Sequence, residues 1–397
     1  MNFSSTIKGP LKGVKVIDFS SFIAGSYSTM LMGDMGAEVT KVESLQGDAA
    51  RHWGPFLAGE SRSFQGWNRN KRSLSVDLRT AEGLEIVYQI VTDADVVVEN
   101  FRPGITEKLK IDYESLKAIN PGLVYCSISA FGSKGPDGKR PGYDPVLQSL
   151  TGAARSNKRL TGNVGVCSVP ISDFGAGFLG WGSVLAALFH KERTGEGQRV
   201  ETSLMQAAMT MQSHMFVKAL EVKEEGAAGI FPYNFLNTKD DIIFIACGTD
   251  KFWKILCEAI DAPELAEDPE YDTNPKRVVA AEKLRVIVED LLAKKTTKEW
   301  TEILVSAGMP CAPAQTQEEY FEDPQVEAMN MNAIVDHSKI GRTRLSGVPF
   351  HFEKTPGFAQ SAAPMLGEHS DAILRECGYS DAKIRSLCNN GIVKNGS

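Results

Sequence analysis

Hydrophobic and polar positions in the first half of the chain follow two alternating patterns. Short, mostly apolar runs are typical of buried strands, and they occur at Val14–Phe19, Ala37–Glu43, Asp95–Asn100 and Leu123–Ser129. Helical spacing is found between them, at Tyr27–Met35 and in a segment that Thr80 can cap. This alternation predicts an α/β fold with an open, doubly wound parallel sheet that has helices on both faces. Ligands bind beyond the carboxyl ends of such strands, so residues 100–104 and 130–138 are candidate binding loops.

The pattern changes after about residue 226. We expect a strand at 241–247, followed by helices at 251–260, 274–295 and 298–307. The predicted domains are a large Rossmann-like domain over 1–225, a smaller inserted α+β domain over 226–325, and a C-terminal part over 326–397 that returns to the large domain. A strand at Val348–Phe352 and a helix from Ser370 to Cys377 are expected in that last part.

Composition narrows the class of protein. The 397 residues suggest roughly two or three domains. A net charge of −7 argues against a nucleic-acid partner, so an anionic ligand must be bound by local basic groups. The seven cysteines form no Cys-x-x-Cys pair, and the six histidines lack metal-ligand spacing, which predicts reduced thiols and no metal site. No hydrophobic signal region is seen, and the apolar run Phe174–Phe189 is short for a bilayer, so we expect a cytoplasmic protein that does not insert in a membrane.

Asp173 is the residue with the clearest chemical potential. It follows an apolar run, 164–171, that is expected to be a strand, and it precedes a glycine-rich helix. A carboxylate at a helix N-terminus meets free N–H groups and the positive end of the helix dipole, which predicts an ionised side chain. A fixed carboxylate beside exposed backbone suits covalent acyl transfer. The structural alternative is that Asp173 is only an N-cap.

The glycines that follow allow a second interpretation. Gly175-Ala-Gly-Phe-Leu-Gly180 fits the dinucleotide pattern G-x-G-x-x-G, and Glu201 lies about twenty residues further on. Asp173 would repel a pyrophosphate there, and the motif is in the middle of the chain. Close helix packing is therefore the favoured use of these glycines.

Basic side chains are concentrated near predicted strand ends, in the segment 68–73 and at Arg79 and Lys108. They either bind a phosphorylated ligand or are solvated at the surface.

These segments, taken in order, resemble the class III CoA-transferases, the family of formyl-CoA transferase and carnitine CoA-transferase. The resemblance runs over nearly the whole chain and is carried by Pro10–Asp18, Ala24–Gly25, Met35–Glu43, Asn70–Ser73, Val98–Gly104, Gly142–Pro145, Asp173, Pro232–Asn234, Gly308–Pro310 and Leu366–His369.

The resemblance implies an enzyme that moves coenzyme A from an acyl-CoA to a carboxylic acid, with Asp173 as the nucleophile that becomes an aspartyl-CoA thioester. It implies coenzyme A thioester as substrate, no tightly bound cofactor, and an interlocked homodimer or a heteromer with a paralogous subunit. The positions that match coenzyme A contacts of the family are Ile23, Ala24, Val76, Arg79, Asn100, Phe101, Arg102, Lys108, Tyr143 and Asp144.

The chain departs from the formyl-CoA transferases at several positions. Ile23 replaces a glutamine and Ser44 an arginine, and Phe231–Asn234 occupies the general region of their tetraglycine loop. Arg51 and Arg62 match the region of the acyl pocket, where a guanidinium could hold the second carboxylate of a succinyl-type dicarboxylate.

Two alternatives stay open at this stage. Racemases of the superfamily carry histidine where this chain has Tyr143, so an acyl-CoA racemase or epimerase would lack its base. A catalytically silent partner subunit is the other alternative. We also expect the backbone N–H groups of Gly175–Gly177 to stabilise an oxyanion.

Overall fold

The computed structural model describes residues 9–222 and 229–396. The chain forms two compact units, which are described separately. The first comprises the chain up to Asn157, Asn163–Phe216 and the chain from Pro324, and the second comprises Lys158–Gly162 and Val217–Asp323. The predicted limits at 226 and 325 refer to domains that fold independently, and they stay a prediction.

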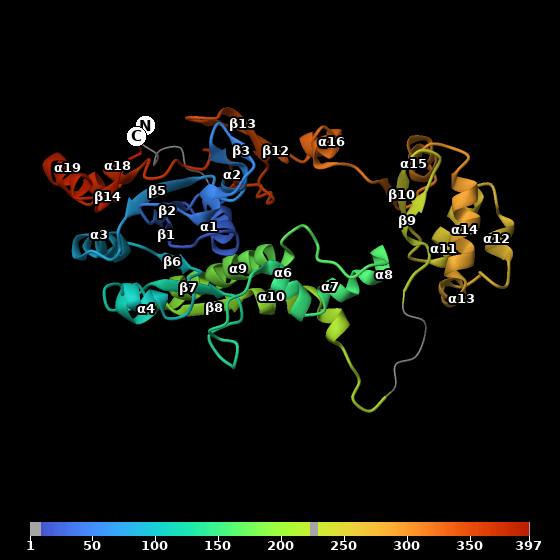
Figure 1. Cartoon of the computed structure of the whole chain (residues 1–397), viewed down its shortest axis with the longest axis horizontal. Coiled ribbons are helices and arrows are strands. Elements are labelled where there is room, and N and C mark those ends of the chain that lie inside the picture. Colours follow the sequence, from blue (N-terminus) through green and yellow to red (C-terminus); the bar gives the residue numbers. More distant parts are fainter. Residues whose placement is uncertain (1–8, 223–228, 397) are drawn as a thin grey trace. The chain divides into compact units, whose positions relative to one another are not determined.

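A seven-stranded sheet forms the centre of the first unit, with the strand order β14-β5-β2-β1-β6-β7-β8 (Figure 1). All neighbouring strands are parallel except β14, which pairs antiparallel with β5. The expected parallel α/β sheet is therefore confirmed. Its strands are β1 (Lys15–Asp18), β2 (Glu38–Glu43), β5 (Lys71–Val76), β6 (Val96–Glu99), β7 (Val124–Ser129), β8 (Arg199–Ser203) and β14 (Val393–Lys394).

Alternate residues of each central strand enter separate hydrophobic cores, because successive side chains point to opposite faces of a sheet. Val96 and Val98 pack in one core with α1 (Ala24–Asp34), α9 (Ile171–Thr194) and α10 (Leu204–Met211). Val97 packs in the other core. Helices α3 (Ala81–Thr92), α18 (Ser370–Glu376) and α19 (Asp381–Asn389) cover that face. Thr80 caps α3 as predicted, by accepting from the Gly83 N–H.

Shorter elements connect these layers. They are η2 (Ala49–His52), β3 (Phe56–Leu57), β4 (Glu60–Ser61), α2 (Arg62–Gly66), α4 (Ile105–Leu109), α5 (Tyr113–Lys117), α6 (Asp144–Leu150), α7 (Ala153–Ser156), η3 (Ser213–Phe216), α17 (Pro324–Ala328), β12 (Asn332–His337) and β13 (Gly341–Ser346).

Two strand predictions are wrong. Residues 348–352 form no strand, because Pro349 lacks a donor for a ladder and Phe350 instead stacks on Trp181, with ring centroids 4.8 Å apart. The strands of this region are β12 and β13, which pair antiparallel across a turn at residues 338–340. Residues 164–169 are also irregular, and Ile171 already begins α9.

The second unit has its own three-stranded antiparallel sheet of β9 (Tyr233–Asn237), β10 (Ile242–Ala246) and β11 (Cys311–Pro313). The buried indoles of Trp253 and Trp300 lie in its core. Its helices are α8 (Lys158–Thr161), α11 (Asp250–Ala259), α12 (Glu264–Glu267), α13 (Asn274–Val279), α14 (Ala281–Leu292), α15 (Thr297–Ser306) and α16 (Gln317–Phe321). The expected strand and helices are present, and the predicted helix 274–295 is divided in two at Ala280.

Helix α9 has 24 residues and is the one described helix that is long and apolar enough to cross a membrane by length and composition. In the first unit, to which it belongs, α9 packs on other elements through its glycines. A Cβ added to Gly177 would lie 2.9 Å from the Ala24 carbonyl oxygen of α1, and one added to Gly180 would lie 2.7 Å from the Ile128 side chain of β7. Helix packing is thus the structural use of these residues, as predicted.

We predict that Gly177→Ala lowers the free energy of unfolding by about 1–3 kcal/mol, because the methyl group would force backbone apart. Urea denaturation measures this. Gly182→Ala in the same helix is the matched control. An added Cβ there meets nothing within 4 Å, so it should be neutral or stabilise by about 0.5–1 kcal/mol. Equal stability of the Gly177→Ala variant and the wild type would contradict the packing argument.

Candidate active site

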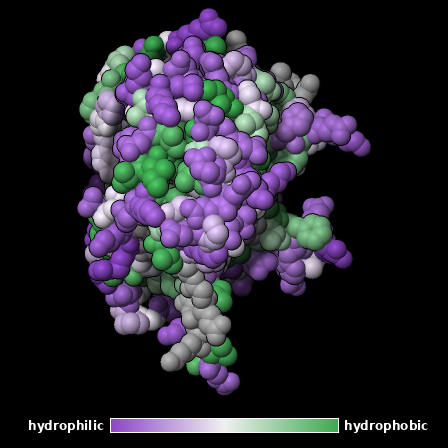
Figure 2. Space-filling view, turned by 90° about the vertical axis from the view of Figure 1, so that its right-hand side faces the viewer, coloured by the Kyte–Doolittle hydropathy of each residue, from purple (hydrophilic) through white to green (hydrophobic). Residues whose placement is uncertain are grey.

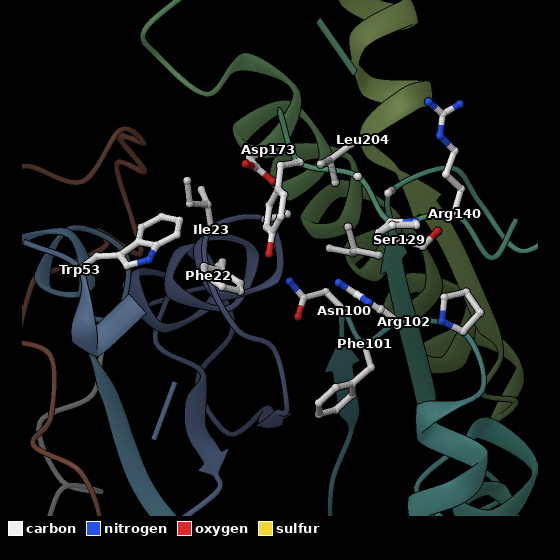
Figure 3. Close-up of a pocket in the computed structure, with 17 residues that line it drawn as sticks. Phe22, Ile23, Trp53, Asn100, Phe101, Arg102, Ser129, Arg140, Asp173 and Leu204 are labelled. Atoms are coloured by element: carbon white, nitrogen blue, oxygen red, sulfur yellow. The ribbon is translucent and has the colours of Figure 1, made fainter. Parts of the chain in front are cut away.

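A pocket of about 170 Å³ lies at the carboxyl ends of β6 and β7, next to the start of α9 (Figure 3). This is where an open parallel sheet is expected to bind ligands. The loop after β6 lines the pocket, as expected. Of the loop after β7, only residues near its two ends line the pocket. The lining residues are Phe22, Ile23, Ala24, Trp53, Asn100, Phe101, Arg102, Pro103, Ile128, Ser129, Ala130, Arg140, Pro141, Gly142, Tyr143, Asp173 and Leu204.

Asp173 is the third residue of α9 and lines this pocket. The predicted N-cap position is wrong, because α9 starts three residues earlier than expected and Pro170 occupies the cap. Within the described part of the chain the Asp173 carboxylate accepts no hydrogen bond. It is therefore not tied to the neighbouring main chain and is free to react.

The expected ionised state of the Asp173 side chain is also corrected. Burial, and then the negative charge of Asp144, raise its pKa from 3.8 to about 7. A helix N-terminus stabilises an anion by about 0.3–1 kcal/mol, which is less than the free energy that this rise in pKa represents. Loss of hydration therefore outweighs the helix dipole, and near neutral pH Asp173 exchanges between its protonated and ionised forms.

Asp144 connects α6 to the start of α9. One oxygen of its buried carboxylate accepts from the Ser172 N–H at 2.6 Å, and the other accepts from the Gln148 amide at 2.6 Å. Gln148 in turn donates to the Cys167 carbonyl and accepts from the Cys167 N–H. This network fixes the backbone that leads into Asp173, at Cys167 and Ser172, and ties α6 to the start of α9.

An aromatic wall forms another side of the pocket. The Phe22 ring lies 4.9 Å from Trp53 and 6.0 Å from Tyr143, measured between ring centroids. Tyr143 was predicted for the site, whereas Trp53 and Phe22 were missed. No local pattern around Trp53 marks it, since it reaches the pocket only through the fold of the segment after β2.

The loop after β6 supplies Asn100, Phe101 and Arg102. The Glu99 carboxylate accepts from the Phe101 N–H at 2.9 Å, and burial raises the pKa of Glu99 to about 7. Arg102 is exposed, and its guanidinium pairs with no side chain or carbonyl among the described residues. It is thus available to bind an anion at the pocket.

Four of the predicted coenzyme A contacts do not line the pocket, namely Asp144, which is described above, and three others. Val76 is fully buried in the core that α3 covers. Arg79 is exposed and forms an ion pair with Asp77 at 2.8 Å, and Lys108 is exposed on α4. A pocket of about 170 Å³ is too small for a whole coenzyme A, so contacts beyond it stay predictions for these three positions.

The hypothesis that Arg51 holds a substrate carboxylate is wrong. Its guanidinium makes two hydrogen bonds to the Glu43 carboxylate, at 2.7 and 2.8 Å, and donates to the Pro364 carbonyl at 3.0 Å. The side chain is buried over the Phe64 ring and does not line the pocket. Arg62 is exposed at the first position of α2 and also lies outside the pocket lining.

The glycines of α9 provide neither an oxyanion site nor a dinucleotide turn. Gly175 and Gly177 lie beyond the first helical turn, where N–H groups donate to carbonyls four residues earlier. No strand precedes them. Phe231–Asn234, the segment in the general region of the tetraglycine loop, belongs to the second unit.

Comparisons with known proteins identify the family of the chain. Residues 11–370 match the family model of CoA-transferase family III. The chain is 32% identical over 393 residues to the human succinyl-CoA:glutarate CoA-transferase, covering 97% of this chain and 90% of the relative. It is 34% identical over 385 residues to the succinate–glutarate CoA-transferase of Agrobacterium fabrum, covering 93% and 96%.

A solved structure gives the same result at the level of the fold. The crystal structure of a CAIB/BAIF family protein from Brucella suis superposes with a TM-score of 0.80 at 34% identity, covering 93% of this chain and 100% of that one. With a family match over nearly the whole length and a pocket that contains Asp173, the chain belongs to CoA-transferase family III and is an enzyme of that class.

Proposed function

We propose that this enzyme moves coenzyme A from an acyl-CoA donor to a carboxylic acid acceptor, through a thioester on Asp173. The observation that carries the proposal is the position of Asp173, whose carboxylate lines the pocket and accepts no hydrogen bond from the described chain. Coenzyme A is a substrate in this reaction and no tightly bound cofactor takes part.

The reaction proceeds in two matched halves. An Asp173 oxygen attacks the donor thioester, the C–S bond breaks, and a mixed anhydride and CoA thiolate form. The thiolate attacks the Asp173 carbonyl carbon and releases the donor acid, leaving the aspartyl-CoA thioester. The acceptor carboxylate attacks that carbon and displaces the thiolate, which then attacks the acceptor side of the new anhydride. Acceptor acyl-CoA leaves and the Asp173 carboxylate is restored.

The electrostatics of the pocket favour this chemistry. Asp173 as a carboxylate is poorly hydrated and lies near the charge of Asp144. Conversion to an anhydride or thioester removes the Asp173 charge and with it both unfavourable effects. Burial and Asp144 thus oppose the free carboxylate and tolerate the covalent intermediate.

A succinyl-type dicarboxylate is the acid class that we propose. Both relatives described above are named for transfer between succinate or succinyl-CoA and glutarate. We keep the assignment of Arg102 to coenzyme A, because the pantetheine and phosphate groups must leave the pocket through exposed loops such as this one.

For the assembly we propose an interlocked homodimer, or a heteromer with a paralogous subunit. Apolar side chains are exposed on α9 and α10 in the single chain, namely Phe178, Phe189, Met209 and Met211. Exposed apolar groups in such number favour a protein partner over solvent. Figure 2 shows one face of the molecule, on which hydrophobic areas are separated by hydrophilic ones.

We predict that acyl-CoA without acceptor modifies Asp173. Hydroxylamine should convert the thioester into a hydroxamate that peptide mass spectrometry locates at this residue. Asp173→Ala should reduce transfer by more than about a thousandfold. Asp290→Asn, at an exposed position of α14 in the second unit, is the control and should transfer normally.

Full activity of Asp173→Ala, or no modification in an active wild type, would refute the proposed intermediate. Exchange of the substrate α-proton with deuterated water in the absence of acceptor would point to a racemase instead. An inactive wild type that binds acyl-CoA would point to a silent subunit.

Another prediction concerns the pH dependence of the transfer rate. Because only the ionised form of Asp173 is nucleophilic, kcat/KM for acyl-CoA should rise with pH through a midpoint near 7. Asp144→Asn removes the neighbouring negative charge, so the midpoint should move to lower pH. Gln148→Ala loosens the same network without a change of charge and should leave the midpoint in place. A flat profile between pH 6 and 8 would contradict the role of Asp173.

The third prediction separates the two anions that Arg102 could bind. Arg102→Gln should raise KM for succinyl-CoA while the ratio of kcat/KM for glutarate over pentanoate, which has the same length and one carboxylate, stays constant. A fall in that ratio would instead assign Arg102 to the second carboxylate of the acceptor. The wild type should prefer glutarate, and a preference for pentanoate would refute the dicarboxylate class.

A further inference from the structure

Phe22 has an unusual backbone conformation at the wall of the pocket. Its φ angle is 60°, in the left-handed region that bulky side chains rarely adopt. Such a conformation persists only where the surroundings hold it in place. The ring of Phe22 packs on Trp53 and Tyr143, so whatever holds this backbone also sets the position of the aromatic wall.

Two polar side chains hold the loop that carries Phe22. Asn100 accepts from the Ser21 N–H at 2.8 Å and donates to the Ser21 carbonyl at 2.7 Å. Asp48 approaches from the other side, where one oxygen accepts from the Ser21 hydroxyl at 2.6 Å and from the Phe22 N–H at 3.1 Å. The same oxygen accepts from the Ala50 N–H at 2.9 Å, which makes Asp48 the N-cap of η2 as well.

The other oxygen of Asp48 faces Lys41. Their N···O distance is 3.1 Å, and the side chains are 1% and 0% exposed. Lys41 also donates to the Ser20 carbonyl at 2.7 Å, so the ammonium and the carboxylate hold successive residues of one loop.

Both groups of this pair are held in their charged forms. Burial alone would raise the pKa of Asp48, but Lys41 and the hydrogen bonds from Ser21, Ala50 and Phe22 lower it. Burial opposes the charge of Lys41 too, and the surrounding carboxylates raise its pKa.

We propose that Asp48, with Lys41 behind it, is a positioning residue for the transfer reaction. Asp48 does not line the pocket and acts through Ser21 and Phe22. It fixes the Phe22–Ala24 edge of the pocket that Asp173 also lines, so that the acyl group meets the nucleophile at the right place. This inference rests on the proposed function, since it names what aligns the acyl-CoA with Asp173.

The test compares three variants in steady-state transfer from succinyl-CoA to glutarate, with Tm measured for each. Asp48→Asn keeps the shape of the side chain and removes its charge. Ser21→Ala removes one bond to Asp48 and leaves no buried charge unpaired. The control is Asp34→Asn, a buried carboxylate paired with Arg69 at 2.7 Å at the other end of α1, outside the pocket lining.

We expect Asp48→Asn to lower kcat/KM by roughly ten- to hundredfold, as a small misplacement of reacting groups does, with a rise in KM for succinyl-CoA. Ser21→Ala should change the same constants in the same direction by less. Asp34→Asn should lower Tm and leave both constants within about twofold of the wild type. Unchanged kinetics in Asp48→Asn, or kinetic losses that follow Tm in all three variants, would overturn the proposal.

Two further results keep this test decisive. If Asp48→Asn does not fold, Ser21→Ala decides, and a wild-type kcat/KM in that variant refutes the positioning role. If the wild type transfers no coenzyme A, the proposed function fails, and calorimetry then measures succinyl-CoA binding in an Asp173→Ala background. Weaker binding on addition of Ser21→Ala would still support the loop anchor, and equal binding would refute it.

Discussion

The contact between α1 and α9 is the constraint on which the site depends. Gly177 allows the backbone of α9 to approach the Ala24 carbonyl so closely that a methyl group would lie 2.9 Å from it. This contact brings the first turn of α9, with Asp173, beside the loop that begins α1, with Phe22 and Ile23. Nucleophile and pocket wall come from residues far apart in the sequence, and the packing of two helices sets the distance between them.

Around this contact the protein stabilises charges selectively. Arg51, Glu43, Lys41 and Asp48 are buried in pairs, and each charge has a partner within 3.1 Å. Asp173 is also poorly hydrated, but it has no cationic partner among residues 9–222 and 229–396, and the charged group that most affects it is another carboxylate, Asp144. The difference separates structural charges, which must stay ionised, from a reactive charge that is lost when the covalent bond forms.

Much of the fold could be predicted from the sequence, because valine-rich runs and helical spacing are local signals. The strands β1, β2, β6 and β7 were expected near their observed positions. The hairpin of β12 and β13 was missed, since β12 exposes Ile334 and buries His337, the reverse of the usual apolar-in pattern, and the two strands pair with each other.

The site was harder to predict. Its position beyond the strand ends and its nucleophile candidate came from motif and resemblance, but the roles of Arg51 and Phe22 depend on long-range contacts. The Arg51 guanidinium donates a hydrogen bond to the Pro364 carbonyl, and the Phe22 N–H donates one to the Asp48 carboxylate. The pKa of Asp173 is raised by its burial and by the nearby Asp144, and no local sequence pattern reveals either of these.

The antiparallel pairing of β14 with β5 has a consequence for biosynthesis. Val393 pairs with Val76, so β5 stays an open sheet edge until almost the whole described chain has left the ribosome. An open edge strand presents unpaired backbone N–H and C=O groups and is a template for pairing with another chain. The nascent protein therefore depends on late closure by its own C-terminal segment, and the interval before closure is the period in which it is most exposed to aggregation and to capture by chaperones.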